Sequence, residues 1–148
     1  MKMQKLDGDR IPALVGLSSA DGFPFVMTEE TARVYCGGRQ PADDGVQTYG
    51  VFEDAALVCV ATATFCRVFP HAAAPSGRIV HISGVYTLPD FRNRRYAAQL
   101  LDLIGAEARA FGADYLCCDS TADGFYLRCG FAPAPESETK MWKTIHIL

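Results

Sequence analysis

The chain has 148 residues, of which 49% are hydrophobic and 21% are charged, and its formal net charge is −3. These values are ordinary for one globular domain that buries its own core, and they argue against a general nucleic-acid-binding protein. The sequence shows no signal peptide, no apolar run of membrane-spanning length and no lipidation motif. We therefore expect a cytoplasmic protein with no membrane partner.

Residues 1–45 are expected to form an N-terminal helical region. Its clearest element is a helix over residues 28–36, because Thr28 can accept the first amide hydrogens and two glutamates follow in the first turn. Gly37 and its neighbouring glycine end that helix, and a loop follows.

From residue 46 the pattern changes to strands that are rich in β-branched side chains. Strands are predicted over residues 47–52 and 56–69, which form a hairpin, and over residues 78–87. Pro89 ends the third strand, because proline has no N–H to donate and keeps the preceding residue extended.

A helix over residues 94–111 is predicted by apolar residues spaced three and four apart, from Ala97 to Phe111. Gly112 is its expected C-terminal stop. The remaining predicted elements are a strand over 114–118, a helix over 121–129 closed by Gly130, and strands over 131–135 and 140–147. This order predicts an α/β fold with a mixed sheet.

The six cysteines lie mostly inside apolar runs, and no CxxC pair is present. Free cysteine behaves as a small buried hydrophobe, so we expect core thiols. No metal site is predicted, because His71 and His146 have no partner at a metal-binding spacing.

A cationic turn joins the third strand to the 94–111 helix. Arg92, Arg94 and Arg95 lie within four positions there. Free N–H groups at a helix start and the helix dipole both attract anions. The turn therefore predicts a binding site for a polyanion. Nucleic acid is not expected there, because the sequence lacks a basic face and an aromatic platform for stacked bases.

Two segments carry a family resemblance. Residues 85–101 read Val-Tyr-Thr-Leu-Pro-Asp-Phe-Arg-Asn-Arg-Arg-Tyr-Ala-Ala-Gln-Leu-Leu, and residues 122–131 read Ala-Asp-Gly-Phe-Tyr-Leu-Arg-Cys-Gly-Phe. In this order they resemble the GCN5-related N-acetyltransferases, the GNAT superfamily. The first matches the family's strand, Pro-x-aromatic-Arg turn and helix, and the second matches its A…(F/L)Y.(K/R).GF segment.

The resemblance covers residues 46–146 and implies a single GNAT-like domain over residues 1–148. The implied fold is α/β, with a mixed, mostly antiparallel central sheet flanked by helices. The family's turn is Gln/Arg-x-x-Gly-x-Gly/Ala, and Arg92 and Ala97 fit it, whereas Arg95 stands where the first glycine is expected. Glycine there accepts unusual dihedral angles, while arginine keeps the N–H, adds a charge and adds bulk. We expect cofactor binding to be retained with altered geometry.

The resemblance implies acetyl-CoA as co-substrate, with its pyrophosphate on the amides of residues 92–97. Its pantetheine arm would pair with backbone groups of Val85 and Thr87, at an edge left open because the neighbouring parallel strand splays away. Asp119 stands near a position where the family often has a cofactor-contacting asparagine, although an ionised carboxylate cannot donate. The implied cofactor-binding set is Val85, Tyr86, Thr87, Arg92, Asn93, Arg94, Arg95, Tyr96, Ala97, Ala98 and Asp119.

The implied reaction is direct attack of a primary amine, from a small molecule or a peptide, on the thioester. Tyr126 occupies the family's tyrosine position and is the candidate general acid, since a phenol can donate a proton. His81 lies six residues before Thr87, so strand alternation places both on one face, and it resembles a position where some members carry a glutamate base. A base acting through ordered water, anchored by Ser83, is the open alternative. Cys129 invites a covalent acetyl-cysteine, but packing is the preferred interpretation.

A second class of function is a non-catalytic acyl-CoA-sensing or partner-binding domain on the same fold, because Arg95 departs from the family pattern and a fold does not guarantee activity. The apolar, threonine-rich hairpin is also a candidate surface for a homodimer.

Overall fold

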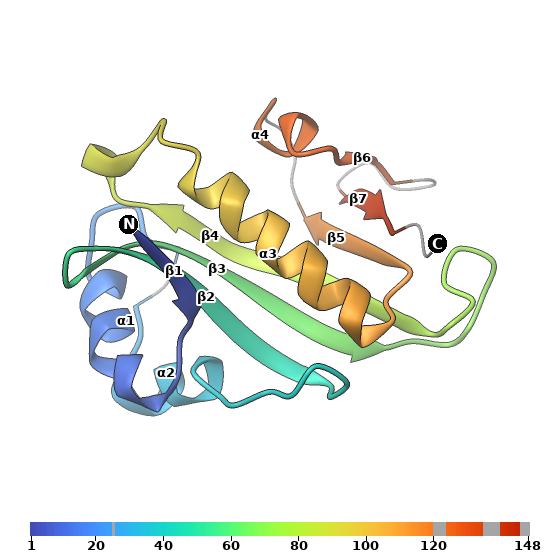
Figure 1. Ribbon diagram of the computed structural model, residues 1–148, viewed down its shortest axis with the longest axis horizontal. Coiled ribbons are helices and arrows are strands. Elements are labelled where there is room, and N and C mark those ends of the chain that lie inside the picture. Colours follow the sequence, from blue (N-terminus) through green and yellow to red (C-terminus); the bar gives the residue numbers. More distant parts are fainter. Residues whose placement is uncertain (25, 120–123, 135–139, 146–148) are drawn as a thin grey trace. The chain divides into compact units, whose positions relative to one another are not determined.

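The computed structural model describes residues 1–24, 26–119, 124–134 and 140–145 (Figure 1). Its strands form one sheet in the order β1-β2-β3-β4-β5-β7-β6. They are β1 (Lys2–Lys5), β2 (Gly45–Glu53), β3 (Ala56–Arg67), β4 (Arg78–Thr87), β5 (Tyr115–Asp119), β6 (Ala132–Pro133) and β7 (Lys140–Thr144). The helices are α1 (Ile11–Ser18), α2 (Glu29–Tyr35), α3 (Tyr96–Phe111) and α4 (Gly124–Arg128), with short 3₁₀ turns at Gly8–Arg10 (η1) and Pro89–Phe91 (η2).

Strand pairing confirms the predicted mixed sheet. β1 runs antiparallel to β2, and β7 lies between β5 and β6 and runs antiparallel to both. β4 and β5 run parallel, in a register from Ile79 opposite Tyr115 to Ile82 opposite Cys118. A parallel pair needs a crossover connection, and the segment that contains α3 provides it.

The chain divides into two compact units. The first contains Met1–Arg39, Val46–Thr62 and Gly84–Leu100. The second contains Gln40–Gly45, Ala63–Ser83 and Leu101–Leu148.

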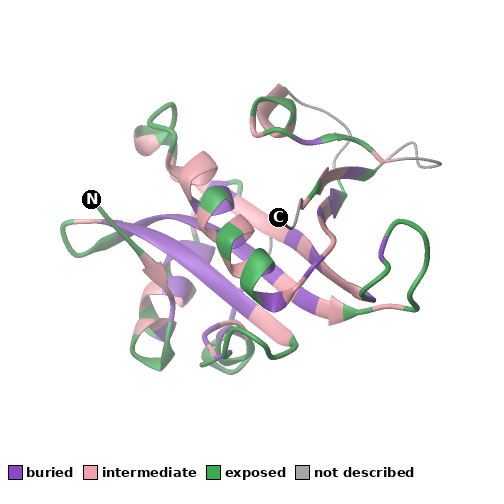
Figure 2. Ribbon diagram, turned by 45° about the vertical axis from the view of Figure 1, so that its right-hand side comes forward, coloured by how far each residue is buried: buried purple, intermediate pink, exposed green. Residues whose placement is uncertain are grey.

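The core of the first unit lies under α1 and α2, which are neighbours in Figure 1. Leu14 of α1 and Ala32 of α2 are buried in the same apolar cluster as Val60 of β3 and Tyr86 of β4. Each fully buried aliphatic side chain of leucine size contributes about 2 kcal/mol. The Tyr86 hydroxyl donates to the Asp21 carbonyl oxygen at 2.7 Å, so this buried ring keeps its polar end satisfied. Figure 2 shows β2 buried along most of its length.

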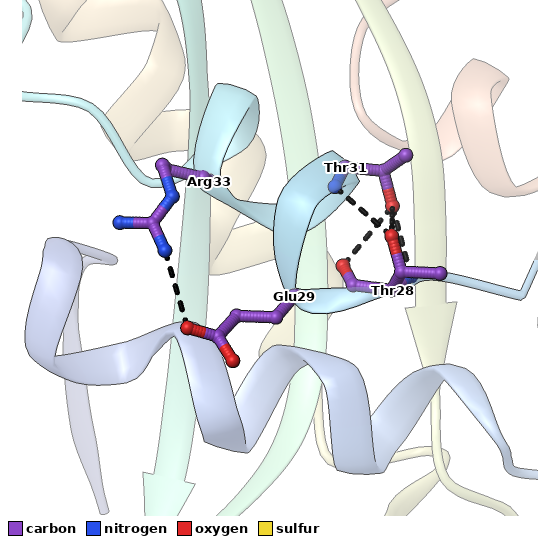
Figure 3. Close-up of polar contacts among 4 residues, drawn as sticks. All are labelled: Thr28, Glu29, Thr31 and Arg33. Carbon is purple, nitrogen blue, oxygen red and sulfur yellow. Dashed lines mark hydrogen bonds and ion pairs between the residues drawn. The ribbon is translucent and has the colours of Figure 1, made fainter.

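α2 begins as its sequence predicts. The Thr28 hydroxyl accepts from the Thr31 amide at 3.2 Å, and the Thr31 hydroxyl accepts from the Thr28 amide at 2.9 Å (Figure 3). This reciprocal capping box satisfies two amides that the helix itself leaves without acceptors. Glu29 and Arg33 add an exposed ion pair one turn apart, at 3.1 Å.

The second unit packs the C-terminal part of α3 against its strands. Ile104, Ala108 and Phe111 are buried, and the Phe111 ring meets Phe65 of β3 edge to face at 5.5 Å. Gly112 has a φ of 85°, and the amide of residue 113 donates to the Ala108 carbonyl, as in a Schellman motif. Gly130, with a φ of 90°, ends α4 in the same way. Both predicted glycine stops are confirmed.

Three expectations need correction. β1 is a strand inside the region expected to be helical, because its edge pairing with β2 outweighs a short polar sequence with weak strand preference. α3 begins at Tyr96 rather than at residue 94, since Arg95 has a left-handed backbone. β6 covers only Ala132–Pro133 of the expected 131–135 strand.

Parts of the expected C-terminal elements, at residues 121–123, 135 and 146–147, lie outside the described residues. All six cysteines lie within them, and none of the six forms a disulfide. Cys36, Cys59 and Cys118 are buried as expected, whereas Cys66, Cys117 and Cys129 are half-buried. No helix in the described part of the chain has both the length and the apolar character to span a membrane.

Replacing Thr28 by alanine is expected to lower the free energy of unfolding by about 1 kcal/mol, because an N-cap acceptor and its reciprocal bond are lost. Urea unfolding followed by circular dichroism measures this. The matched control on the same helix is Arg33→Gln, which breaks only the exposed ion pair and should cost about 0.3 kcal/mol. Equal effects of the two substitutions would contradict the capping account.

Candidate functional site

The junction between β4 and α3 belongs to the first unit and contains most of the residues predicted to bind a cofactor. After η2, Asn93 and Arg95 both have a φ of 64°, in the left-handed region. A residue with a Cβ at such a position costs about 1 kcal/mol relative to glycine. Arg95 therefore has a left-handed backbone, the kind of conformation that a glycine accepts more readily.

The first turn of α3 presents backbone donors. The Gln99 amide donates to the Arg95 carbonyl oxygen at 3.0 Å, which makes Arg95 the residue that precedes the helix. The amides from Arg95 to Ala98 precede this first intrahelical bond, so the helix supplies no acceptor for them. The first turn of α3 carries no acidic residue. Amides that point out of a left-handed turn at a helix start form an anion-binding concavity.

The three arginines of the turn differ in their contacts. The Arg92 Nε donates to the Thr87 carbonyl oxygen at 2.9 Å. The Arg94 guanidinium lies 5.0 Å from the centre of the Phe91 ring, a cation–π distance. The Arg95 side chain is exposed, and no hydrogen bond or ion pair joins that side chain to a residue that the structure describes. Arg95 is thus a charged side chain beside the open amides.

Two side chains near this turn are held by polar contacts. The Tyr96 hydroxyl donates to Oε1 of Glu53, a short contact that raises the pKa of Tyr96. Because this hydroxyl is bound to Glu53, the group of Tyr96 that is available to an anion at the turn is its backbone amide. Thr87 Oγ1 lies 3.2 Å from the sulfur of Cys59, and burial raises the pKa of Cys59 to about 11, so this thiol stays protonated at neutral pH.

The end of β4 is the segment where Val85 and Thr87 were predicted to hold the pantetheine arm. The β4–β5 register runs to Ile82 opposite Cys118, while β4 continues to Thr87. The Thr87 carbonyl already accepts from Arg92, which leaves it one further lone pair.

Gly84 interrupts the regular alternation of β4, because its φ of 60° is left-handed. Strand alternation therefore does not place His81 and Thr87 on one face across this glycine.

The second unit holds the remaining predicted residues. His81 on β4 and Asp119 at the end of β5 form a polar pair, with 3.2 Å between Nε2 and Oδ2. The His81 side chain is 35% exposed and the Asp119 side chain 62% exposed. Both residues were predicted from the sequence as site residues, but the contact between them was not predicted. The pair depends on the parallel β4–β5 register, which places Cys117 opposite His81 and Asp119 two residues further on.

Cys117 of β5 lies opposite His81 of β4 on one side and opposite Trp142 of β7 on the other. Burial raises the pKa of the Cys117 thiol to about 11, and the charge of Asp119 adds to the shift. The Trp142 ring meets Tyr115 edge to face at 5.1 Å. The residue opposite His81 on β5 is thus a cysteine whose thiol is protonated at neutral pH.

Tyr126 lies on α4, in the same unit as the His81–Asp119 pair. Its ring is half-buried between Phe125, at 5.0 Å, and Phe131, at 5.4 Å. The Phe131 amide donates to the Tyr126 carbonyl at 2.9 Å, so the closing turn at Gly130 holds the end of this helix. Three aromatic rings in edge contact limit the orientations that the Tyr126 ring can adopt.

The second unit also has a cavity of about 240 Å³ beside α3. It is lined by Leu101, Asp102, Gly105, Ala106, Arg109, Leu116, Lys143, Thr144 and Ile145. None of the residues predicted to bind a cofactor or to catalyse lines it, so the candidate site does not rest on this cavity. Within the described residues no group of three or more histidine, cysteine or acidic side chains is placed to hold a metal ion.

A family model for the acetyltransferase (GNAT) domain matches residues 45–133. No curated protein matches the sequence significantly. Among solved structures, a GNAT-family acetyltransferase of Streptococcus pneumoniae is similar with a TM-score of 0.71 and 14% identity, over 98% of this chain and 99% of that one.

Two further structures were solved with a ligand. The PaiA N-acetyltransferase of Thermoplasma acidophilum, in complex with coenzyme A, has a TM-score of 0.70 and 14% identity, over 97% and 98% of the two chains. A predicted acetyltransferase of Clostridium acetobutylicum, with acetyl-CoA, has a TM-score of 0.68 and 19% identity, over 92% of each chain. At these identities the similarity supports the fold.

Replacing Arg95 by glycine is expected to raise the free energy of unfolding by about 0.5 kcal/mol. Relief of the left-handed strain, about 1 kcal/mol, exceeds the entropy that glycine adds to the unfolded chain. The neighbouring Arg94→Gly is the matched control, because residue 94 has no positive φ and glycine there should destabilise. Chemical denaturation measures both. A destabilised Arg95→Gly protein would contradict the strain assignment.

Proposed function

This chain belongs to the GNAT acetyltransferase family, and we propose that it transfers the acetyl group of acetyl-CoA to a primary amine of a small molecule or a peptide. The observation that carries the proposal is the β4–α3 junction. There the open amides from Arg95 to Ala98 lie beside the exposed Arg95 side chain. Acetyl-CoA supplies an activated thioester and a pyrophosphate that such a junction is suited to bind.

The residues of the first unit would bind the co-substrate. Backbone amides at the start of α3 would donate to the pyrophosphate, and Arg95 would add a charge-assisted contact. The end of β4 would supply backbone groups at Val85 and Thr87 in the manner of strand addition. For a full bond at the Thr87 carbonyl, the Arg92 side chain must share that oxygen or turn away from it.

Two side chains, His81 and Tyr126, would move the protons. A primary amine is mostly protonated at neutral pH and must lose a proton before it attacks. His81 would take that proton as general base, with a base acting through water as the alternative. As the C–N bond forms and the C–S bond breaks, Tyr126 would donate its hydroxyl proton to the leaving sulfur.

The half-buried Tyr126 ring supports this role, because its contacts with Phe125 and Phe131 hold it in place. For Cys129 we keep a structural role as the preferred interpretation over a covalent acetyl-cysteine. Its carbonyl accepts from Lys143 and its amide closes the end of α4, so its backbone serves the local structure. Direct attack by the amine needs no covalent intermediate on the protein.

Acetyl-CoA is expected to raise the melting temperature by several degrees at a concentration far above its Kd, because it binds the folded chain alone. Differential scanning fluorimetry measures this. No shift with acetyl-CoA would overturn the proposal. A shift without turnover on any amine of a broad panel would instead favour the non-catalytic acyl-CoA-sensing or partner-binding alternative.

Replacing Tyr126 by phenylalanine is expected to lower kcat by about 100-fold, since a positioned general acid typically contributes 10²–10⁴-fold. KM for acetyl-CoA should stay within about twofold, because the lost hydroxyl acts in the transition state. The readout is thiol release with a reactive amine. Tyr35→Phe in α2 is the matched control and should retain full activity. Unchanged kcat in Tyr126→Phe would remove the tyrosine from the mechanism.

A further inference from the structure

We propose that Asp119 is the positioning residue of His81, holding the imidazole with Nδ1 available to take a proton. The inference rests on the proposed function, in which His81 is the general base. It assigns Asp119 a different role from the cofactor contact suggested by its position near the family's asparagine. The observation behind it is the 3.2 Å contact between His81 Nε2 and Asp119 Oδ2.

The contact follows from the fold. His81 and Cys117 are opposite one another in the parallel β4–β5 ladder, and Asp119 follows Cys117 by two residues on the same side of β5. The two side chains come from positions 38 residues apart, on adjacent strands whose backbones are hydrogen-bonded. Both positions are therefore defined by sheet structure, which holds functional groups more precisely than a loop does.

The direction of the hydrogen bond decides the chemistry. An ionised carboxylate only accepts, so Nε2 must carry the hydrogen and donate it to Asp119. A neutral imidazole with its hydrogen on Nε2 has its lone pair on Nδ1. When Nδ1 takes a proton from an ammonium group, the ring becomes an imidazolium, and the adjacent carboxylate stabilises that cation. A carboxylate behind a histidine base acts in this way in hydrolase triads.

The surrounding charges are compatible with this role. Asp119 lies opposite Lys140 in the antiparallel β5–β7 ladder, so the carboxylate has a cationic neighbour on the side of β7. On β5 the residue opposite His81 is Cys117, which is protonated at neutral pH because burial raises its pKa to about 11. On β3, burial likewise raises the pKa of Cys66. The thiols therefore add no negative charge near the imidazole.

Stability alone gives little reason for the pair. Ion pairs between side chains as exposed as these contribute about 0–1 kcal/mol, so an Asp119 substitution should leave the chain folded. Asp119 pairs with Lys140 in the β5–β7 ladder, and alanine or asparagine at this position can make the same backbone hydrogen bonds. The role of the carboxylate can consequently be measured in folded variants.

The first test is the tautomer of His81, read from ¹⁵N chemical shifts of the histidine rings. In the wild-type chain the hydrogen should reside on Nε2. Asp119→Asn should keep this state, because the amide oxygen still accepts, whereas Asp119→Ala should give a mixture of both neutral tautomers. His71 is an internal control, since its Nδ1 contacts the Phe69 carbonyl at 2.7 Å and should not respond. An unchanged His81 tautomer in Asp119→Ala would overturn the proposal.

The second test is steady-state kinetics with acetyl-CoA and a reactive amine. Asp119→Ala should lower kcat by about tenfold with KM for acetyl-CoA unchanged, and Asp119→Asn should recover part of the loss. Asp102→Ala, on the exposed side of α3, is the matched control and should behave as wild type. A raised KM for acetyl-CoA with kcat retained would instead make Asp119 a cofactor contact and overturn the positioning role.

The two tests separate the possible failures. One possible result is that the His81 tautomer changes in Asp119→Ala but the wild-type chain has no transferase activity. That result would contradict the proposed function, and the catalytic part of this inference with it. An active chain whose tautomer and kcat ignore Asp119 would contradict the positioning role alone.

Discussion

The left-handed turn at Asn93 and Arg95 is the constraint on which the candidate site depends. It sets where α3 begins, and it leaves the amides from Arg95 to Ala98 without intrahelical acceptors. Two non-glycine residues with φ near 64° cost about 1 kcal/mol each, and local strain of this kind persists when the surrounding structure holds it. Here the support comes from both sides of the turn: Arg92 is bonded to the Thr87 carbonyl, and α3 is anchored by buried Leu100.

The left-handed backbone at Arg95 bears on the two possible effects of this residue. As a sequence feature it is both an added charge and the loss of an expected glycine. In the structure the backbone has the conformation glycine would adopt, and the side chain is exposed. Charge and turn shape are therefore compatible at this position. The departure of Arg95 from the family pattern, which motivated the non-catalytic alternative, therefore does not prevent a left-handed backbone at this position.

The helix ends that depend on a few neighbouring residues could be predicted from the sequence. Thr28 begins α2, and Gly112 and Gly130 end α3 and α4, because each uses a capping pattern spanning only a few residues. β1 was not predicted, since a four-residue polar strand is formed by its pairing with β2 rather than by its own preference. The His81–Asp119 contact was missed for a similar reason. It joins residues that are 38 apart in the sequence on two paired strands, and a local sequence pattern does not show which residues of two strands lie beside each other.

The central claim is that the start of α3 binds the pyrophosphate of acetyl-CoA. Titration of the ¹⁵N-labelled chain with coenzyme A, followed through its backbone amide resonances, tests it most directly. The account predicts large, saturable shifts of the amides from Arg95 to Ala98, with the α2 amides at Thr28 and Thr31 unchanged. Saturable binding that leaves the Arg95–Ala98 amides unshifted would contradict it.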